Sequence, residues 1–264
     1  MTGRPGFHDR HPAFTDRTDI VDGLAIFTRV PRDQPAGRCP TVVIIHGLSI
    51  SSRYELPTAR RLAKTCRVFA PDLPGYGCSD DPETIPSIAG LADWMCRWMD
   101  VVGLGDVTLV GDSLGAHVAS EMARRRPGQV THLVLSGLSI DPSGRHRSTQ
   151  ILRAMRDVPR EPWSLLALHV RDFFFAGPGR VLRTLRSAIA DPFSERLPDI
   201  PIPTLVVRGE RDLISPRSWS EHVASVLPRG AYREVAGAPH AVNYACPDTY
   251  AAIIQDWIDH GGSA

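Results

Sequence analysis

The chain lacks the patterns that mark several large protein classes. Among its 264 residues, thirty basic side chains nearly balance twenty-nine acidic ones, for a net charge of +1. No apolar stretch approaches the ~20 residues of a membrane span, and the polar start, Met1 to Asp19, contains no apolar signal-peptide core. We therefore expect a cytoplasmic protein. The balanced charge gives no general electrostatic reason to expect a nucleic acid or a membrane as partner.

Patterns for disulfides, metals and nucleotides are also missing. The five cysteines are odd in number, are scattered along the chain and form no CxxC pair, which is typical of reduced thiols. The ten histidines show neither HExxH nor another clustered ligand spacing, so we expect no metal site. Neither GxGxxG nor GxxxxGK[ST] occurs, which argues against a nucleotide. The sequence thus predicts a protein that works without a cofactor.

What the sequence does contain is an alternation of apolar strands and helices. This alternation predicts an α/β fold with a mostly parallel, doubly wound sheet and helices on both faces. The expected strands are residues 24–30, 41–45, 67–70, 107–110, 130–136, 203–209 and 232–235. The expected helices are residues 54–64, 87–102, 116–126 and 248–258.

The alternation stops between Leu138 and Pro198, where three helical stretches occur instead, at residues 146–157, 162–175 and 179–190. We expect a core of residues 1–138 and 198–264 and a helical cap of residues 139–197. An insertion at this point would cover the carboxyl ends of the strands, shape a substrate pocket and exclude water.

The composition of this predicted cap leaves two questions open. Its aromatic residues, Trp163 and Phe174 among them, either line an apolar pocket or pack the cap onto the core. Residues 141–190 also contain nine arginines against four acids. Most of these arginines fit a solvated helical face, and the alternative is a basic surface that attracts an anionic substrate or an acyl-carrier partner.

Residues 111–115, GDSLG, indicate a nucleophile at a sharp turn between a strand and a helix. Such a turn places Ser113 in a costly backbone conformation, and the glycines on either side keep Cβ atoms out of the crowded space. We interpret Asp112, the residue before the serine, as a cap of the helix start.

Two partners for this serine follow in the chain order that such a turn requires. Asp212 lies just beyond the strand at 203–209, and His240 lies in a loop before the last helix. A serine hydroxyl needs a base, and histidine needs a carboxylate that fixes its tautomer. Because the ends of parallel strands meet at one edge of a sheet, we expect Ser113, Asp212 and His240 to form a catalytic triad.

The turn after the strand at 41–45, HGLS, supplies the remaining element. An oxyanion hole needs two backbone N–H donors, and we expect them from Leu48 and from Leu114, the residue after the nucleophile. We interpret His46 as a structural hydrogen-bonding residue. Weaker candidates for substrate contact are found in the residues after this turn and in the cap: Ser49, Arg53, Tyr54, Trp163 and Phe174.

These motifs resemble the α/β-hydrolase family along nearly the whole chain. The oxyanion turn at 46–49, the loop APDLPGYGCS at 70–79, the GDSLG turn, the acid loop GERD at 209–212 and the histidine loop at 239–244 all match in order. The HGLS turn lacks the HGGG run of many lipases, and Asp112 stands where many members carry histidine or another residue.

The resemblance implies a serine hydrolase, and we expect it to act on a small carboxylic ester or lactone through an acyl-enzyme. The same triad also serves C–C bond hydrolases of the meta-cleavage type, thioesterases, and acyltransferases or cyclases. Fold resemblance does not separate these activities. Some members of the fold are ligand receptors without turnover, which the intact set of Ser113, Asp212 and His240 argues against.

Overall fold

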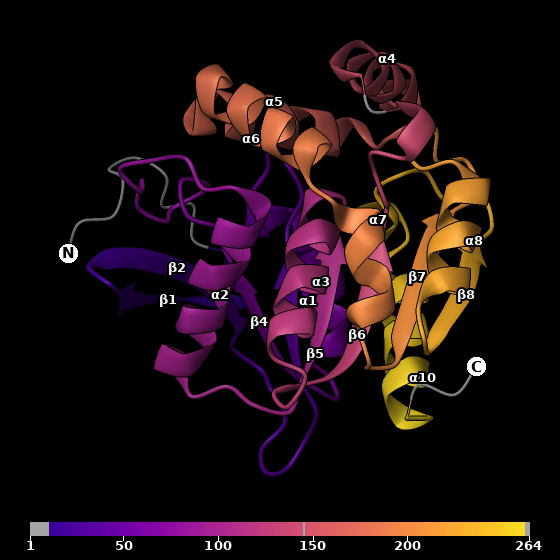
Figure 1. Ribbon diagram of the computed structural model, residues 1–264. Helices are drawn as coiled ribbons and strands as arrows, with labels where there is room; N and C mark the ends of the chain where they lie inside the picture. The colour runs from indigo at the N-terminus through magenta and orange to yellow at the C-terminus, as the bar shows by residue number, and fades with distance from the viewer. Residues whose placement is uncertain (1–10, 145, 262–264) are drawn as a thin grey trace.

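The computed structural model describes residues 11–144 and 146–261. Its centre is one eight-stranded sheet in the order β1-β2-β4-β3-β5-β6-β7-β8 (Figure 1). β1 pairs antiparallel with β2 and β2 with β4, while the pairs from β4 to β8 are parallel. The predicted α/β fold with a mostly parallel sheet is confirmed. The strands are β1 (Phe14–Val21), β2 (Leu24–Pro31), β3 (Thr41–Ile45), β4 (Arg67–Pro71), β5 (Val107–Asp112), β6 (Val130–Ser136), β7 (Thr204–Gly209) and β8 (Gly230–Val235).

Helices cover both faces of the sheet, which explains why most residues of its central strands are apolar. In β3, Val43 and Ile45 are buried in the same cluster as α2 (Ile88–Val102) and α3 (Leu114–Arg125). The alternate residues Val42 and Ile44 are buried in the cluster that contains side chains of α1 and α10. The remaining helices of the core are η1 (Ser52–Glu55), α1 (Leu56–Leu62), α8 (Arg217–Val226), α9 (Val242–Ala245) and α10 (Pro247–Asp259).

The described residues between β6 and β7 form helices and loops, and we call residues 139–197 the cap segment. It contains η2 (Pro142–Gly144), α4 (Arg147–Asp157), η3 (Val158–Arg160), α5 (Trp163–Ala176), α6 (Pro178–Ala190) and α7 (Phe193–Arg196), followed by η4 (Leu197–Asp199). The three helices predicted in this segment are confirmed. α4, α5 and α6 lie across one end of the sheet, whereas α7 descends beside the core (Figure 1).

The edge strand of the sheet was not predicted. β1 is an edge strand whose residues are mostly exposed, apart from the buried Phe14 and Val21 at its ends. Its sequence, FTDRTDIV, is polar because one side of the strand has no neighbour and faces solvent.

In the described parts of the chain, none of the helices has both the length and the apolar character that crossing a bilayer requires.

Candidate active site

Ser113 occupies the turn between β5 and α3. Its φ of 53° and ψ of −114° lie outside the regions that side-chain-bearing residues normally adopt. The turn is tight because a Cβ on Gly111 would lie 2.4 Å from the carbonyl oxygen of Gly115. A Cβ on Gly115 would lie 2.0 Å from the carbonyl oxygen of Ile45. The expected strained turn, with glycine required on either side, is therefore present.

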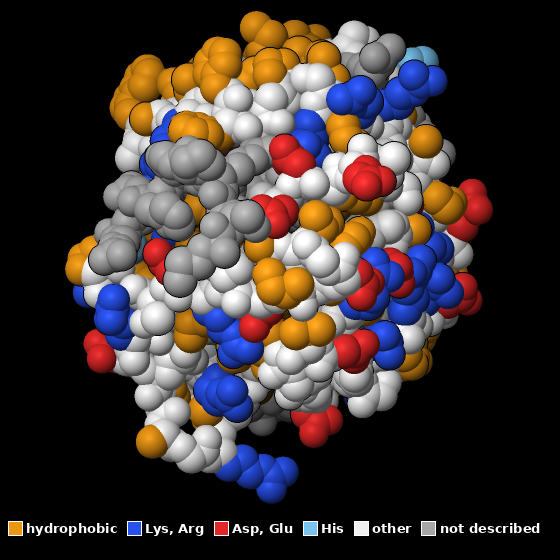
Figure 2. Space-filling view, turned by 90° about the vertical axis from the view of Figure 1, so that its left-hand side faces the viewer, with side chains coloured by type: hydrophobic (Ala, Val, Ile, Leu, Met, Phe, Trp, Pro, Cys, Tyr) orange, Lys and Arg blue, Asp and Glu red, His pale blue; other side chains and the backbone are white. Residues whose placement is uncertain are grey.

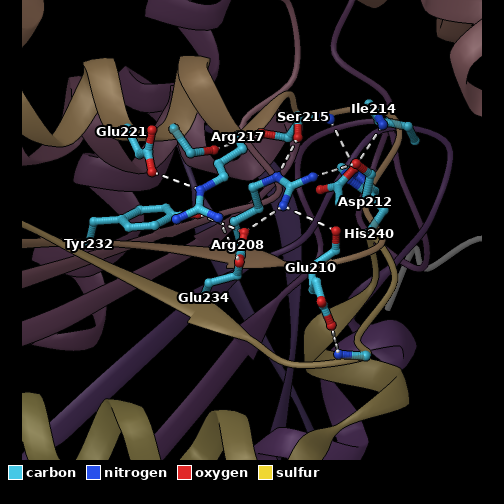
Figure 3. Close-up of polar contacts among 12 residues, drawn as sticks. Arg208, Glu210, Asp212, Ile214, Ser215, Arg217, Glu221, Tyr232, Glu234 and His240 are labelled. Atoms are coloured by element: carbon cyan, nitrogen blue, oxygen red, sulfur yellow. Dashed lines mark hydrogen bonds and ion pairs between the residues drawn. The ribbon is translucent and has the colours of Figure 1, made fainter.

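Asp212 and His240 meet although 28 residues separate them, because β7 and β8 are neighbours in the sheet and both residues lie beyond the strand ends. The imidazole Nδ1 of His240 lies 2.8 Å from the Asp212 Oδ2 atom (Figure 3). The other carboxylate oxygen, Oδ1, accepts hydrogen bonds from the backbone N–H groups of Ile214 and Ser215, at 2.7 and 2.8 Å. Asp212 is thus held in place as a hydrogen-bond acceptor for the His240 ring.

Arg208, in β7, organises the loop that carries Asp212. Its guanidinium donates to the carbonyl oxygens of Asp212 and Ser215 at 2.8 and 2.7 Å, and to that of Glu210 at 3.3 Å (Figure 3). It also pairs with Glu234 in β8 at 2.7 Å. Five donors in a rigid fork suit an arginine for joining several carbonyls of one loop. No motif in the sequence singles out Arg208.

Two carboxyl groups of the cap segment join it to the loops of Asp212 and His240. Asp157, at the end of α4, accepts a hydrogen bond from the N–H of Leu213 at 3.1 Å. Glu161 accepts one from the N–H of Ala241 at 2.9 Å. Each bonded amide comes directly after one of the paired residues, Asp212 or His240. The position of the cap is therefore tied to the position of the Asp212–His240 pair.

The same carboxyl groups alter the protonation of the imidazole. Burial opposes a charged ring, but Asp212, through its charge and its hydrogen bond, together with Asp157 and Glu161, outweighs burial and raises the pKa of His240 to about 9. Burial raises the pKa of Glu161 itself to about 7, although its hydrogen bond to Ala241 and the charge of His240 oppose that rise.

A cavity of about 310 Å³ lies between the strand ends and the cap segment. Both Ser113 and His240 line it, as do Leu48 and Leu114, the expected oxyanion residues, and the weaker candidates Ser49 and Tyr54. The walls are contributed by α4, α5 and α6 and are largely apolar, with Ala154, Leu165, Leu166, Leu185 and Ala188 among them. The described structure therefore gathers six of the predicted site residues around one cavity.

Three weaker candidates do not line this cavity. Trp163 and Phe174 are 82% and 69% exposed and do not line the cavity, so they take neither of the two roles left open for them, pocket lining or packing of the cap onto the core. They lie eleven residues apart, on one side of α5, and the helix turns its other side, with Leu165 and His169, toward the cavity. Arg53 is buried beside a second hollow of about 620 Å³, which other arginines also line.

The turn after β3 lies directly against Ser113. A Cβ on Gly47 would be 3.4 Å from the Cβ of Ser113, which brings the N–H of the following Leu48 into the neighbourhood of the serine. Leu114 is the first residue of α3, where N–H groups have no partner within the helix. His46 has the structural role predicted for it, because its Nε2 accepts from the N–H of Leu73 at 2.9 Å and its Nδ1 lies 2.8 Å from the carbonyl oxygen of Gly47.

The sequence predicted that Asp112 caps α3, but it does not. Its carboxylate lies under the turn and accepts a hydrogen bond from the hydroxyl of Ser136, which in turn accepts one from the hydroxyl of Tyr250 at 2.9 Å. Burial raises the pKa of Asp112 to about 7, while contact with Glu55 and the charge of His240 lower it. The capping interpretation failed because Ser113, and not Asp112, occupies the N-cap position of α3, and the side chain of Asp112 is buried.

Three comparisons place the chain among known proteins. Rv2715 of Mycobacterium tuberculosis is 29% identical over 204 residues, which cover 74% of this chain, and the match spans only 58% of that protein's length. The candidate carbamate hydrolase RutD of Pantoea ananatis is 25% identical over 248 residues, 84% of this chain and 90% of RutD. The crystal structure of the enol-lactonase from Burkholderia xenovorans superposes with a TM-score of 0.79 at 20% identity, covering 92% of this chain and all of that one.

The structural likeness at this identity shows a common fold, and a family model extends it to the sequence. The model of the alpha/beta hydrolase family matches residues 42–253, from the strand before the HGLS turn to the last helix. The match includes the turn at Ser113 and the loops of Asp212 and His240. The chain therefore belongs to the α/β hydrolase family.

Proposed function

We propose that the chain is a serine hydrolase that cleaves a small carboxylic ester or lactone through an acyl-enzyme. The observation that carries the proposal is that Ser113 and His240 line one cavity, where Asp212 holds the His240 ring from behind. Because Asp212 occupies Nδ1 of the imidazole, Nε2 is the nitrogen available to the serine hydroxyl. A serine at this position becomes nucleophilic only when a neighbouring base accepts its proton.

The reaction then proceeds in two halves. Ser113 Oγ attacks the carbonyl carbon while His240 accepts its proton, and the N–H groups of Leu48 and Leu114 stabilise the oxyanion. His240 gives the proton to the departing alcohol oxygen, which leaves the acyl group on Ser113. Water attacks the carbonyl carbon of this ester while His240 accepts one of its protons. The bond from the acyl carbon to Ser113 Oγ then breaks, His240 returns the proton to Oγ, and the free acid is released. Asp212 orients the imidazole throughout.

The experiment that tests this reaction class is a panel of esters and lactones of graded acyl length, analysed for product. A hydrolase releases one free acid for each ester bond cleaved. The 310 Å³ cavity with apolar walls leads us to expect higher kcat/KM for acyl chains of several carbons than for acetate. Transfer of the acyl group to an added alcohol in preference to water would favour an acyltransferase. Inertness toward every ester, lactone and thioester would contradict the proposal.

The raised pKa of His240 predicts a dependence of the rate on pH. A protonated imidazole cannot accept the serine proton, so kcat/KM should rise about tenfold for each pH unit and level off near the pKa of about 9. Glu161, with a pKa of about 7, is ionised on this rising limb and favours the imidazolium. Glu161→Gln removes this charge and is expected to move the limb to lower pH and raise the rate at pH 7.

The matched control for this prediction is Asp248→Asn, which removes an exposed carboxylate that pairs with Arg61 at 2.9 Å, outside the cavity. Its pH profile should coincide with that of the unmodified protein. For both variants, kcat/KM is measured against pH with one ester substrate. A limb that stays in place in Glu161→Gln, or moves to higher pH, would contradict the assigned influence of Glu161.

A further inference from the structure

The outer surface of the cap segment exposes many large hydrophobic side chains, which most protein surfaces do not. Nine of the twelve large hydrophobic side chains that are exposed in the described parts of the chain belong to this segment. Hydrophobic side chains, drawn in orange, gather along the top of the molecule in Figure 2, on the side of the cap segment. Large apolar areas of this kind mark surfaces that contact a partner or a lipid.

α4 shows this exposure most clearly. Its inward residues are polar: Gln150 donates to the carbonyl oxygen of Gly144 at 2.7 Å, Arg153 pairs with Asp141, and Asp157 accepts from Leu213. Its exposed residues include three large hydrophobic side chains, Ile151, Leu152 and Met155. A helix of a water-soluble fold normally presents the opposite arrangement. Hydrogen bonds and an ion pair therefore hold α4 on the protein, and its apolar face is left outside.

α5 adds a second apolar stripe. Trp163, Val170 and Phe174 are all exposed, and their spacing of seven and then four residues places them on one face of the helix. Leu182 of α6 is exposed as well. Tryptophan and phenylalanine beside aliphatic residues are typical of the lipid-facing side of helices that lie in a membrane interface.

The charges on this surface are of one sign. Arg156, Arg160, Arg183 and Arg186 are exposed, whereas the acids of residues 147–190, Asp157, Glu161 and Asp172, are turned inward. Asp157 and Glu161 bind backbone amides of the core, and Asp172 accepts a hydrogen bond from Ser51 at 2.6 Å. The near-zero net charge of the whole chain therefore conceals a locally cationic surface.

We propose that this outer face of the cap segment binds an anionic phospholipid surface. The apolar stripes enter the boundary between headgroups and acyl chains, and the four arginines attract the lipid charge. A second copy of the chain fits less well, because a symmetric contact would bring arginines against arginines. A nucleic acid offers no place for the exposed aliphatic side chains. The proposal differs from the expectation, drawn from net charge and from the lack of an apolar span, that the chain has no membrane partner.

The same face adjoins the mouth of the cavity. Ile151 and Val158 are exposed to solvent and also line the cavity, so the cavity opens where the apolar surface begins. A bound bilayer would then face the opening, and an acyl chain would reach Ser113 without crossing water. This second step rests on the proposed function and makes membrane-resident acyl esters the substrate class. The binding step does not depend on catalysis.

The test measures, by flotation, how the 264-residue chain carrying Ser113→Ala binds to vesicles; this substitution excludes turnover. Phosphatidylcholine vesicles are compared with vesicles that also contain phosphatidylglycerol. We expect binding to the anionic vesicles that weakens with salt. The double variant Trp163→Ser, Phe174→Ser should bind at least about tenfold more weakly, because the lipid no longer buries two aromatic rings. The double variant Arg156→Gln, Arg160→Gln should lose about fivefold in affinity per arginine, on anionic vesicles only.

Two matched controls are Ile20→Ser and Arg217→Gln, which alter an exposed apolar and an exposed basic residue outside the cap. Both should bind as the parent does. Absence of binding to either vesicle, or equal binding by all variants, would overturn the docking surface. It would also be overturned if the parent were a dimer that Trp163→Ser, Phe174→Ser converts to monomers. Hydrolysis of soluble esters without hydrolysis of the same acyl chains in a bound vesicle would refute the substrate class alone.

Discussion

Ser113→Ala is expected to reduce kcat by roughly 10⁶-fold while the protein stays folded. The remaining groups, the Asp212–His240 pair and the N–H donors of Leu48 and Leu114, can still bind substrate and polarise its carbonyl. Without the hydroxyl, however, no acyl-enzyme can form. Alanine keeps the Cβ of serine, and the hydrogen bond from the N–H of residue 113 to the carbonyl oxygen of Ser136, 2.9 Å long, is unchanged. The free energy of unfolding should therefore change by about 0.5 kcal/mol or less.

Single-turnover kinetics and thermal unfolding measure the two halves of this prediction. Labelling with a fluorophosphonate probe offers a third readout, since the probe should react with the parent and not with Ser113→Ala. Ser139→Ala provides the control, because Ser139 also lines the cavity but lies on the segment after β6. It should keep its label and an activity within about tenfold of the parent. Retention of activity at that level by Ser113→Ala would mean that another group is the nucleophile.

The sequence predicted the turn at Ser113 well because its requirements are local. Glycine at 111 and 115 is needed where backbone atoms approach within 2.0 to 2.4 Å of a hypothetical Cβ, and such a need is visible in five residues. The meeting of Asp212 with His240 was predictable for another reason. Both follow apolar strands, and parallel strands deliver the residues after them to one edge of the sheet.

Residues whose importance depends on tertiary contacts were missed. Arg208 is one of many arginines in the chain, and only the fold shows that its guanidinium joins three carbonyl oxygens of the Asp212 loop. Glu161 likewise became visible only through its hydrogen bond to Ala241, 80 residues away. The edge strand β1 was missed because a strand with one solvated side carries few apolar residues.

The errors at Trp163 and Phe174 have a related cause. Helical periodicity shows which residues of α5 share a face, but it does not show which face meets the core. Burial normally decides the matter, since the more apolar face turns inward. In α5 both faces are apolar, and the aromatic residues are on the outer one. This exposed apolar face of α5 is part of the proposed lipid-binding surface.

Asp212→Asn is expected to lower kcat by roughly 10⁴-fold with little effect on KM. The asparagine oxygen can still accept the N–H groups of Ile214 and Ser215, which Oδ1 of Asp212 accepts now. Its amide nitrogen then faces Nδ1 of His240 and donates to it. The imidazole is forced into the tautomer with the proton on Nε2, where it cannot accept the proton of Ser113.

Removal of the Asp212 charge also removes a main cause of the raised pKa of His240, so the rising limb of the pH profile should level off well below pH 9. Profiles of kcat for Asp212→Asn and for Asp157→Asn separate the two effects. In Asp157→Asn the limb should shift in the same direction but by less. The plateau value of kcat should equal that of the parent, because Asp157 contacts Leu213 and not the imidazole. Near-normal kcat in Asp212→Asn would mean that another carboxylate orients His240. Asp141, which follows β6 and pairs with Arg153, is the first residue to replace in that case.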